Sequence, residues 1–339
     1  MSIYTYGSVL ALSLGAAWYQ WSKPPSVTEG DEVVILYGEE KSLEEIIWES
    51  DKDKAVIEFR SDAVGNYLWA TYTDKKKEEE QEKSFKVGQD GEKLCADLSP
   101  LVAIRALENV SEEKKEEIGL KTPTTSLSIK RKGKTTVFDV GNEAYGTKDL
   151  YIQNRETKEV FLLDDAKVRT LKFARTRLPD RQLWSFEKEK ITKITLQASL
   201  EGQPKTLVLL NKNWQDKLQA KWVRQDDETA DNTQLTNWIT KYLRSTNSAY
   251  TNDIDVSTLS KAFDIEMEGD GAPKENISVY YDAEKQNWYA QTTHSRGVVK
   301  LIKQSISGLY EDLPALFAAP QETSSEETKE SIPNEDVQK

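Results

Sequence analysis

Two copies of one pattern decide the fold: Val160-Phe161-Leu162-Leu163 followed by Leu178-Pro179, and Val299-Lys300-Leu301-Ile302 followed by Leu313-Pro314. In each copy the apolar run is typical of a strand, and the residues between this run and the Leu-Pro pair have the spacing of a helix. Corresponding positions lie 139 and 135 residues apart. A repeat of this length indicates duplicated domains rather than a solenoid, so we expect two related domains.

Further strand and helix patterns surround both copies. Residues 55–60 and 67–73 are typical of a β-hairpin with Gly65-Asn66 in its turn, and residues 191–200 and 204–210 predict a second hairpin. Helices are expected at residues 93–110, 164–174, 231–243 and 305–317. We therefore predict an α+β protein, in which two related mixed sheet-and-helix domains, residues 33–185 and 186–319, follow one N-terminal transmembrane helix.

The N-terminal segment has the pattern of a membrane anchor. Residues 3–21 contain no charged side chain, and as a helix they would span about 28 Å, close to the roughly 30 Å of a bilayer core. Aromatic residues stand at both ends, and Lys23 with Pro24-Pro25 would end the helix. We expect an anchor at residues 1–22 and a linker at 23–32. A signal peptide cleaved after Gly15-Ala16-Ala17 and a buried core helix are the alternatives.

One face of this segment carries small residues. Gly7, Ala11 and Gly15 recur every four residues, so they would form a smooth stripe on a helix. Small side chains allow another helix to approach closely inside lipid. The stripe predicts packing against an integral membrane protein partner, although a merely small-residue composition would give the same pattern.

Charge excludes one class of partner. The 339 residues carry a formal net charge of -12, and such a surface repels phosphate backbones, so we expect no nucleic acid partner. Residues 320–339 are rich in Glu, Ser and Thr and predict a disordered acidic tail.

Residues able to carry chemistry are scarce. Cys95 is the only cysteine, which excludes an internal disulfide and a cysteine metal cluster. His294 is the only histidine, and its polar neighbours favour an exposed turn over a catalytic base. No metal-ligand spacing or phosphate-binding loop is present. We therefore expect no catalytic residue, no cofactor and no metal, and a protein that is not an enzyme.

A series of short motifs gives a family resemblance. In order, they are Glu117-Ile118-Gly119-Leu120-Lys121-Thr122-Pro123, Val140-Gly141-Asn142, Leu150-Tyr151-Ile152, Val160-Phe161-Leu162-Leu163 and Leu178-Pro179-Asp180-Arg181. Their order and spacing resemble the bacterial domain-of-unknown-function 4340 family, well over residues 30–190 and loosely beyond. The Lys/Glu-rich insert at residues 75–83 departs from the family pattern.

The resemblance implies a setting rather than an activity. Family members are often found beside gliding-motility-type ABC transporter components, with an N-terminal membrane helix and an exported soluble part. It implies a single-pass protein of the bacterial inner membrane with a periplasmic soluble region, although Lys23 alone favours the opposite orientation. The leading hypothesis is a non-enzymatic auxiliary or scaffold subunit of a membrane complex, of ABC-type transport. The alternatives are an anchored carboxylate-dependent hydrolase and a cell-envelope module that binds glycan or peptide.

Overall fold

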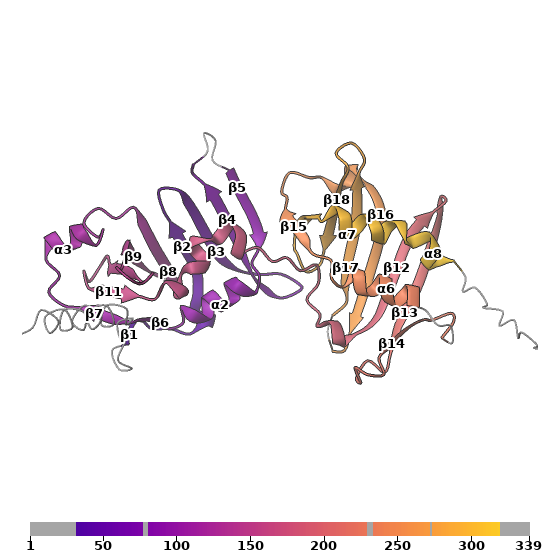
Figure 1. Ribbon diagram of the computed structural model, residues 1–339, viewed down its shortest axis with the longest axis horizontal. Coiled ribbons are helices and arrows are strands. Elements are labelled where there is room, and N and C mark those ends of the chain that lie inside the picture. Colours follow the sequence, from indigo (N-terminus) through magenta and orange to yellow (C-terminus); the bar gives the residue numbers. More distant parts are fainter. Residues whose placement is uncertain (1–31, 77–80, 229–232, 272, 319–339) are drawn as a thin grey trace, which may run out of the picture. The chain divides into compact units, whose positions relative to one another are not determined.

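The computed structural model describes residues 32–76, 81–228, 233–271 and 273–318. Within these residues strands predominate, and the helices are short (Figure 1). The predicted α+β class, with mixed sheet-and-helix domains after a transmembrane helix, is therefore wrong: three antiparallel sheets form the fold.

The stretch 93–110 shows why the helix content was overestimated. Its expected long helix is α2 (Gln89–Asp97) followed by two short strands, β6 (Leu101–Ala103) and β7 (Arg105–Leu107). Short apolar runs fit both a helix and a buried strand, and Pro100 cannot donate the amide hydrogen bond that a helix interior needs.

The chain divides into two compact units. The first unit contains the residues up to Ser185 together with Thr246–Ser260 and Tyr280–Ile302. The second unit contains Phe186–Ser245, Lys261–Val279 and the residues from Lys303 onward. The domain boundaries expected from the sequence, and the repeat behind them, stay predictions.

The first unit is built on a nine-stranded sheet with the order β5-β4-β3-β2-β8-β9-β10-β11-β7. Its remaining strands are β2 (Leu43–Glu49), β3 (Asp53–Ser61), β4 (Asn66–Asp74), β5 (Gln81–Lys86), β8 (Thr125–Arg131), β9 (Lys134–Glu143), β10 (Leu150–Asn154) and β11 (Val160–Leu163). The hairpin expected around Gly65-Asn66 is confirmed, because β3 and β4 pair from Asp53↔Asp74 to Ser61↔Asn66. A separate two-stranded sheet joins β1 (Val33–Leu36) to β6.

The main apolar core of this unit lies on one face of the sheet, and a smaller cluster of Ile118, Leu120 and Val160 is separate from it. Along β4, Leu68, Ala70 and Tyr72 are buried at alternate positions, as a half-buried strand requires. Leu94 and Cys95 of α2 pack into the same apolar cluster. The other helices of the unit are α3 (Glu112–Glu117), α4 (Arg169–Lys172) and α5 (Ala174–Arg177).

An eight-stranded sheet follows, with the order β14-β13-β12-β16-β17-β18-β19-β15. Its strands are β12 (Ile191–Leu200), β13 (Gln203–Lys212), β14 (Lys221–Arg224), β15 (Asn247–Tyr250), β16 (Ser260–Gly269), β17 (Glu275–Asp282), β18 (Asn287–Thr292) and β19 (Val298–Leu301). The second expected hairpin is confirmed as β12 and β13, paired from Lys193↔Leu210 to Leu200↔Gln203. Strands β15, β18 and β19 belong to the first unit.

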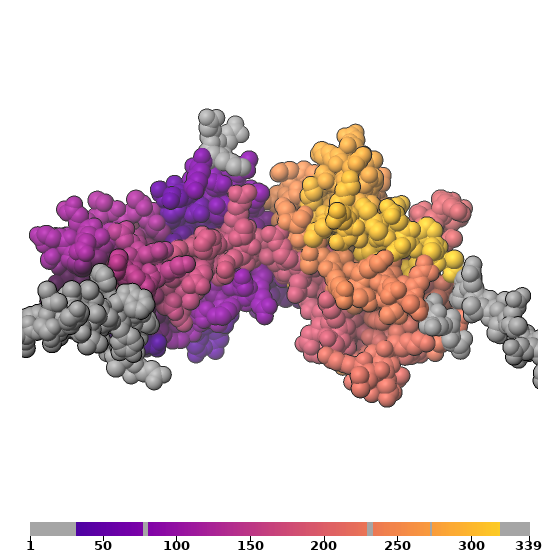
Figure 2. Space-filling model, viewed as in Figure 1, coloured from indigo at the N-terminus to yellow at the C-terminus, as the bar shows by residue number. Residues whose placement is uncertain are grey.

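Among the described residues, three α-helices belong to the second unit: α6 (Thr233–Tyr242), α7 (Lys303–Glu311) and α8 (Leu313–Phe317). The helix expected at 231–243 is thereby confirmed. Trp238 of α6 is buried, and its Nε1 donates a hydrogen bond to the Leu309 carbonyl of α7 at 2.9 Å. Helices α7 and α8 form a continuous yellow stretch of the surface in Figure 2.

The expected localisation needs correction. Among the described residues, no helix combines the length and the apolar character needed to cross a bilayer. The expected anchor at residues 1–22, the linker up to residue 31 and the tail at 320–339 lie outside the described residues. The structure thus gives no support to a single-pass inner-membrane protein.

Candidate functional site

The small-residue stripe lies outside the residues that the structure describes. Gly7, Ala11 and Gly15 all precede the first described residue. Their role in helix packing stays a prediction.

His294 is buried, although the sequence predicted an exposed turn. The turn between β18 and β19 was expected to expose this side chain, but the residue is only 7% exposed. The polar neighbours that suggested solvent instead satisfy one another: the Ser295 amide donates to Thr292 Oγ1 at 2.8 Å, and Ser295 Oγ donates to the Gly297 carbonyl at 2.7 Å. A turn of polar residues can therefore be buried, and the residue types around His294 did not distinguish a buried turn from an exposed one.

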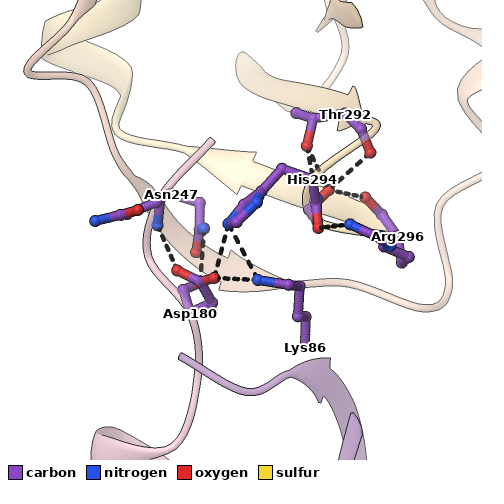
Figure 3. A network of polar contacts seen from close by, with 9 residues as sticks. Lys86, Asp180, Asn247, Thr292, His294 and Arg296 are labelled. Carbon is purple, nitrogen blue, oxygen red and sulfur yellow. Dashed lines mark hydrogen bonds and ion pairs between the residues drawn. The ribbon is translucent and has the colours of Figure 1, made fainter. Parts of the chain in front are cut away.

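The imidazole lies in a buried cluster with an acid and a base (Figure 3). Lys86, the last residue of β5, places Nζ 2.6 Å from Asp180 Oδ2, and His294 Nε2 lies 2.8 Å from the same oxygen. Each of the three side chains is at most 10% exposed. All three residues belong to the first unit. We call them the buried ion-pair cluster.

Proton positions in this cluster follow from the geometry. Nε2 of His294 faces both the Asp180 carboxylate and, at 3.1 Å, the Lys86 ammonium. A ring nitrogen cannot donate and accept at once. Donation from Nε2–H to Asp180 pairs a donor with an anion, whereas acceptance from Lys86 would leave a lone pair 2.8 Å from carboxylate oxygen. The favourable arrangement has both Lys86 and His294 donating to Asp180.

The acid is held ionised. Burial by itself would raise the pKa of the Asp180 carboxyl, but the hydrogen bond from His294 and the charge of Lys86 outweigh burial and lower the pKa from 3.8 to about 2. Asp180 Oδ1 also accepts from the Gln182 amide at 3.0 Å. Both carboxylate oxygens are thus occupied.

Asp180 gives a pH prediction. Because its pKa is lower in the folded state, the stabilisation is fully present above the unfolded pKa near 3.8 and is lost as the pH falls through about 2. A carboxyl with this difference contributes about 2 kcal/mol at neutral pH. We expect urea midpoints of the wild type to fall between about pH 4 and pH 2 more steeply than those of Asp180→Asn, which lacks the titrating group. Parallel profiles in this window would contradict the assignment.

Backbone contacts fix the position of Asp180. Its amide donates to the Lys86 carbonyl at 2.9 Å, and its carbonyl accepts from Asn247 Nδ2 at 3.0 Å. A Cβ added at Gly88 would lie 2.9 Å from the Asp180 Cα, which explains a glycine where the two chain segments approach closely. Gly88 also donates to the Leu178 carbonyl.

The cluster has few options for chemistry. Ser295, next to the histidine, gives its hydroxyl hydrogen to Gly297 and not to His294. Cys95 is fully buried, and burial raises the pKa of its thiol to about 12, so it is not a nucleophile at neutral pH. No group of three or more His, Cys, Asp or Glu side chains in the described ranges could hold a metal ion.

Two surface hollows lie in the first unit. One, of about 220 Å³, is lined by Tyr72, Lys83, Phe85, Arg175, Arg181 and Tyr250, among others, and we call it the cationic groove. The other, of about 510 Å³, contains four carboxylates, Asp253, Asp255, Asp282 and Glu284, and we call it the acidic hollow. Neither was predicted from the sequence, because each combines segments that are distant along the chain.

The glycines of the family motifs have a structural role. Gly119 has a φ of +76°, which favours glycine. A Cβ at Gly141 would lie 2.3 Å from the Ile118 carbonyl oxygen, and the neighbouring Asn142 amide donates to that same oxygen at 2.7 Å. The two motifs therefore join the end of α3 to β9 by close backbone contact.

Fold and site together define a two-unit antiparallel β-protein whose single histidine is locked in a buried ion-pair cluster. Residues 90–262 match the sequence profile of Domain of unknown function (DUF4340). This match covers just over half of the chain, so the protein belongs to that family, as the motifs predicted. Searches of curated proteins and of solved structures found no match.

Proposed function

We propose that this protein is not an enzyme and acts as an auxiliary or scaffold subunit that binds other proteins of a membrane complex of ABC-type transport. The buried ion-pair cluster carries the first part of this proposal. Within the cluster the acid is ionised and hydrogen-bonded at both oxygens, the histidine donates to that acid, and the lysine is paired, so none of these three side chains is free to act as a base or nucleophile. The transport setting rests on the family resemblance.

The acidic hollow is where a second candidate function, that of a carboxylate-dependent hydrolase, would place its catalytic carboxyls. Hydrolysis by paired carboxyls needs one group kept protonated by a raised pKa. Asp255 has its pKa lowered instead, first by a hydrogen bond from the Ser257 side chain. Asp282 Oδ1 accepts from the Glu284 and Lys285 amides at 3.1 and 3.0 Å, which is a turn-capping role. The hollow therefore favours scaffold structure over catalysis.

A third candidate, a glycan-binding surface, would need a row of exposed aromatic side chains on one sheet face. Tyr37, Tyr145, Phe173 and Tyr310 are the strongly exposed aromatics among the described residues, and they lie on separate segments outside the strands. Their dispersion supports no such surface.

Co-purification tests the proposed function. A tagged full-length chain, purified from gently detergent-solubilised cells, is expected to bring down transporter subunits in fixed ratio. Because Asp253 and Glu284 have no role in the proposal, the Asp253→Asn, Glu284→Gln double variant should retain cellular function and the same partners. Loss of function in this variant, with its partners retained and its thermal midpoint unchanged, would instead establish the hydrolase.

A further inference from the structure

The cationic groove differs in charge from the rest of the molecule. The chain has a net charge of -12, yet among the described residues that line this groove every charged side chain is basic: Lys83, Arg175 and Arg181. Lys83 is exposed and has no ion pair among the described residues. Arg175 lies 3.7 Å from Asp74, a long separation that leaves most of its donors available. A positive site on an acidic protein selects ligands of negative charge.

One wall of the groove is the edge strand β5, which contacts β15 but pairs with no described strand on its outer side. β5 is the terminal strand of the nine-stranded sheet. At the end of this strand the Lys86 carbonyl accepts from the Asp180 amide, so the backbone of Lys86 faces away from β4. Because backbone direction alternates along an antiparallel strand, Ser84 and Glu82 face the same open side. Residues 178–180 therefore cover only the last part of the edge, and no described strand pairs with the rest.

The floor of the groove is apolar. Phe85 and Tyr250 have ring centroids 6.2 Å apart, and Tyr72 lies opposite Lys83 in the β4–β5 ladder. Lys83 and Phe85 stand two residues apart, so they share one face of β5. The buried hydroxyl oxygen of Tyr250 has no hydrogen-bond partner among the described residues. An extended segment lying along β5 would thus meet a basic side chain and an aromatic ring at alternate positions.

We propose that the cationic groove and the open edge of β5 bind an extended acidic segment of a partner protein by β-strand addition. The backbone of that segment pairs with Glu82 and Ser84, continuing the short pairing already made by residues 178–180. Its carboxylates, at every second position, meet Lys83 and Arg175. This inference rests on the proposed function and specifies how a partner is held.

Fluorescence anisotropy with designed peptides tests the inference on the full-length protein. The probe is a fluorescein-labelled peptide of alternating glutamate and valine. We expect saturable binding that weakens about tenfold in Lys83→Glu and further in Lys83→Glu, Arg175→Glu. Arg181 is left unchanged because its guanidinium donates to the Ser248 carbonyl and holds β15. Lys148→Glu is the matched control, since Lys148 is exposed, lies in the same unit and is remote from the groove lining.

Two further peptides separate charge from backbone pairing. A peptide of alternating lysine and valine should not bind. A peptide in which proline replaces valine keeps the carboxylates but lacks every second amide donor, and it should bind at least tenfold more weakly. Lys83→Gln provides a milder variant if charge reversal unfolds the chain. The inference is overturned if the acidic peptide does not bind, if all variants bind it equally, or if the proline peptide binds as well.

The outcomes of these experiments distinguish a failure of this inference from a failure of the proposed scaffold function on which it rests. If partners co-purify equally with the wild type and with Lys83→Glu, Arg175→Glu while the acidic peptide fails to bind, the inference is wrong and the scaffold function stands. If the peptide binds as expected but the wild type co-purifies with no partner, the groove is a peptide site and the scaffold function is wrong.

Discussion

Replacing Asp180 with alanine is expected to lower the free energy of unfolding by about 3–5 kcal/mol. The substitution removes the acceptor that both Lys86 and His294 use, and it leaves a buried ammonium without a counter-ion. Removing one partner of a buried pair is costly because the desolvated charge that remains has nothing to offset it. Urea denaturation followed by tryptophan fluorescence measures the change.

A double variant identifies the cause. Lys86→Met, Asp180→Ala removes the stranded charge as well, so it should be more stable than Asp180→Ala alone despite carrying a second change. Glu116→Ala is the surface control, because the one ion pair of Glu116 among the described residues is with exposed Lys121, and its effect should stay below about 1 kcal/mol. A double variant no more stable than the single one would show that packing around Asp180, and not charge, determines its contribution.

The cluster could not have been predicted from the sequence. Asp180 lies 114 residues from His294 and 94 residues from Lys86 along the sequence. Hydrophobic periodicity relates residues only a few positions apart, so it gives no information about contacts over such separations. His294 was interpreted as an exposed residue because its neighbours are polar. The sequence signal was limited to the place of Asp180 after Leu178-Pro179 in a family motif, because a carboxylate requires a partner only where it is buried, and the sequence does not show that burial.

Local chemistry predicted the hairpins well and the fold class poorly. Gly65-Asn66 marked the turn of the first hairpin because positive φ is a local requirement, and the structure has positive φ at Gly65. The turn of the second hairpin has positive φ at Glu201 and Gly202. The run from Leu101 to Leu107 was ambiguous, since three-residue strands are too short to show a period of two. Tertiary pairing of β6 with β1 and of β7 with β11 decided those residues.

Trp238→Ala is expected to have the largest effect in the second unit, a loss of about 3–5 kcal/mol in the free energy of unfolding. The side chain is 1% exposed, and its ring stacks on Tyr242 with centroids 5.5 Å apart and planes 13° apart. Truncation therefore leaves a large apolar cavity beneath α6. It also leaves the Leu309 carbonyl without the indole donor that links α6 to α7.

Two companion variants divide this loss between packing and hydrogen bonding. Trp238→Phe keeps an aromatic ring in the core and removes the Nε1 donor, so it should cost less than Trp238→Ala, with about 1–3 kcal/mol from the unsatisfied carbonyl. Thr240→Ala lies on the same helix, and its exposed hydroxyl bonds only to the Thr236 carbonyl one turn back. Its unfolding midpoint should match that of the wild type. If Trp238→Ala shifts the midpoint no more than Thr240→Ala does, α6 does not pack against the sheet through this ring. The apolar face of α6, from which the helix was correctly predicted, would then pack against another part of the molecule.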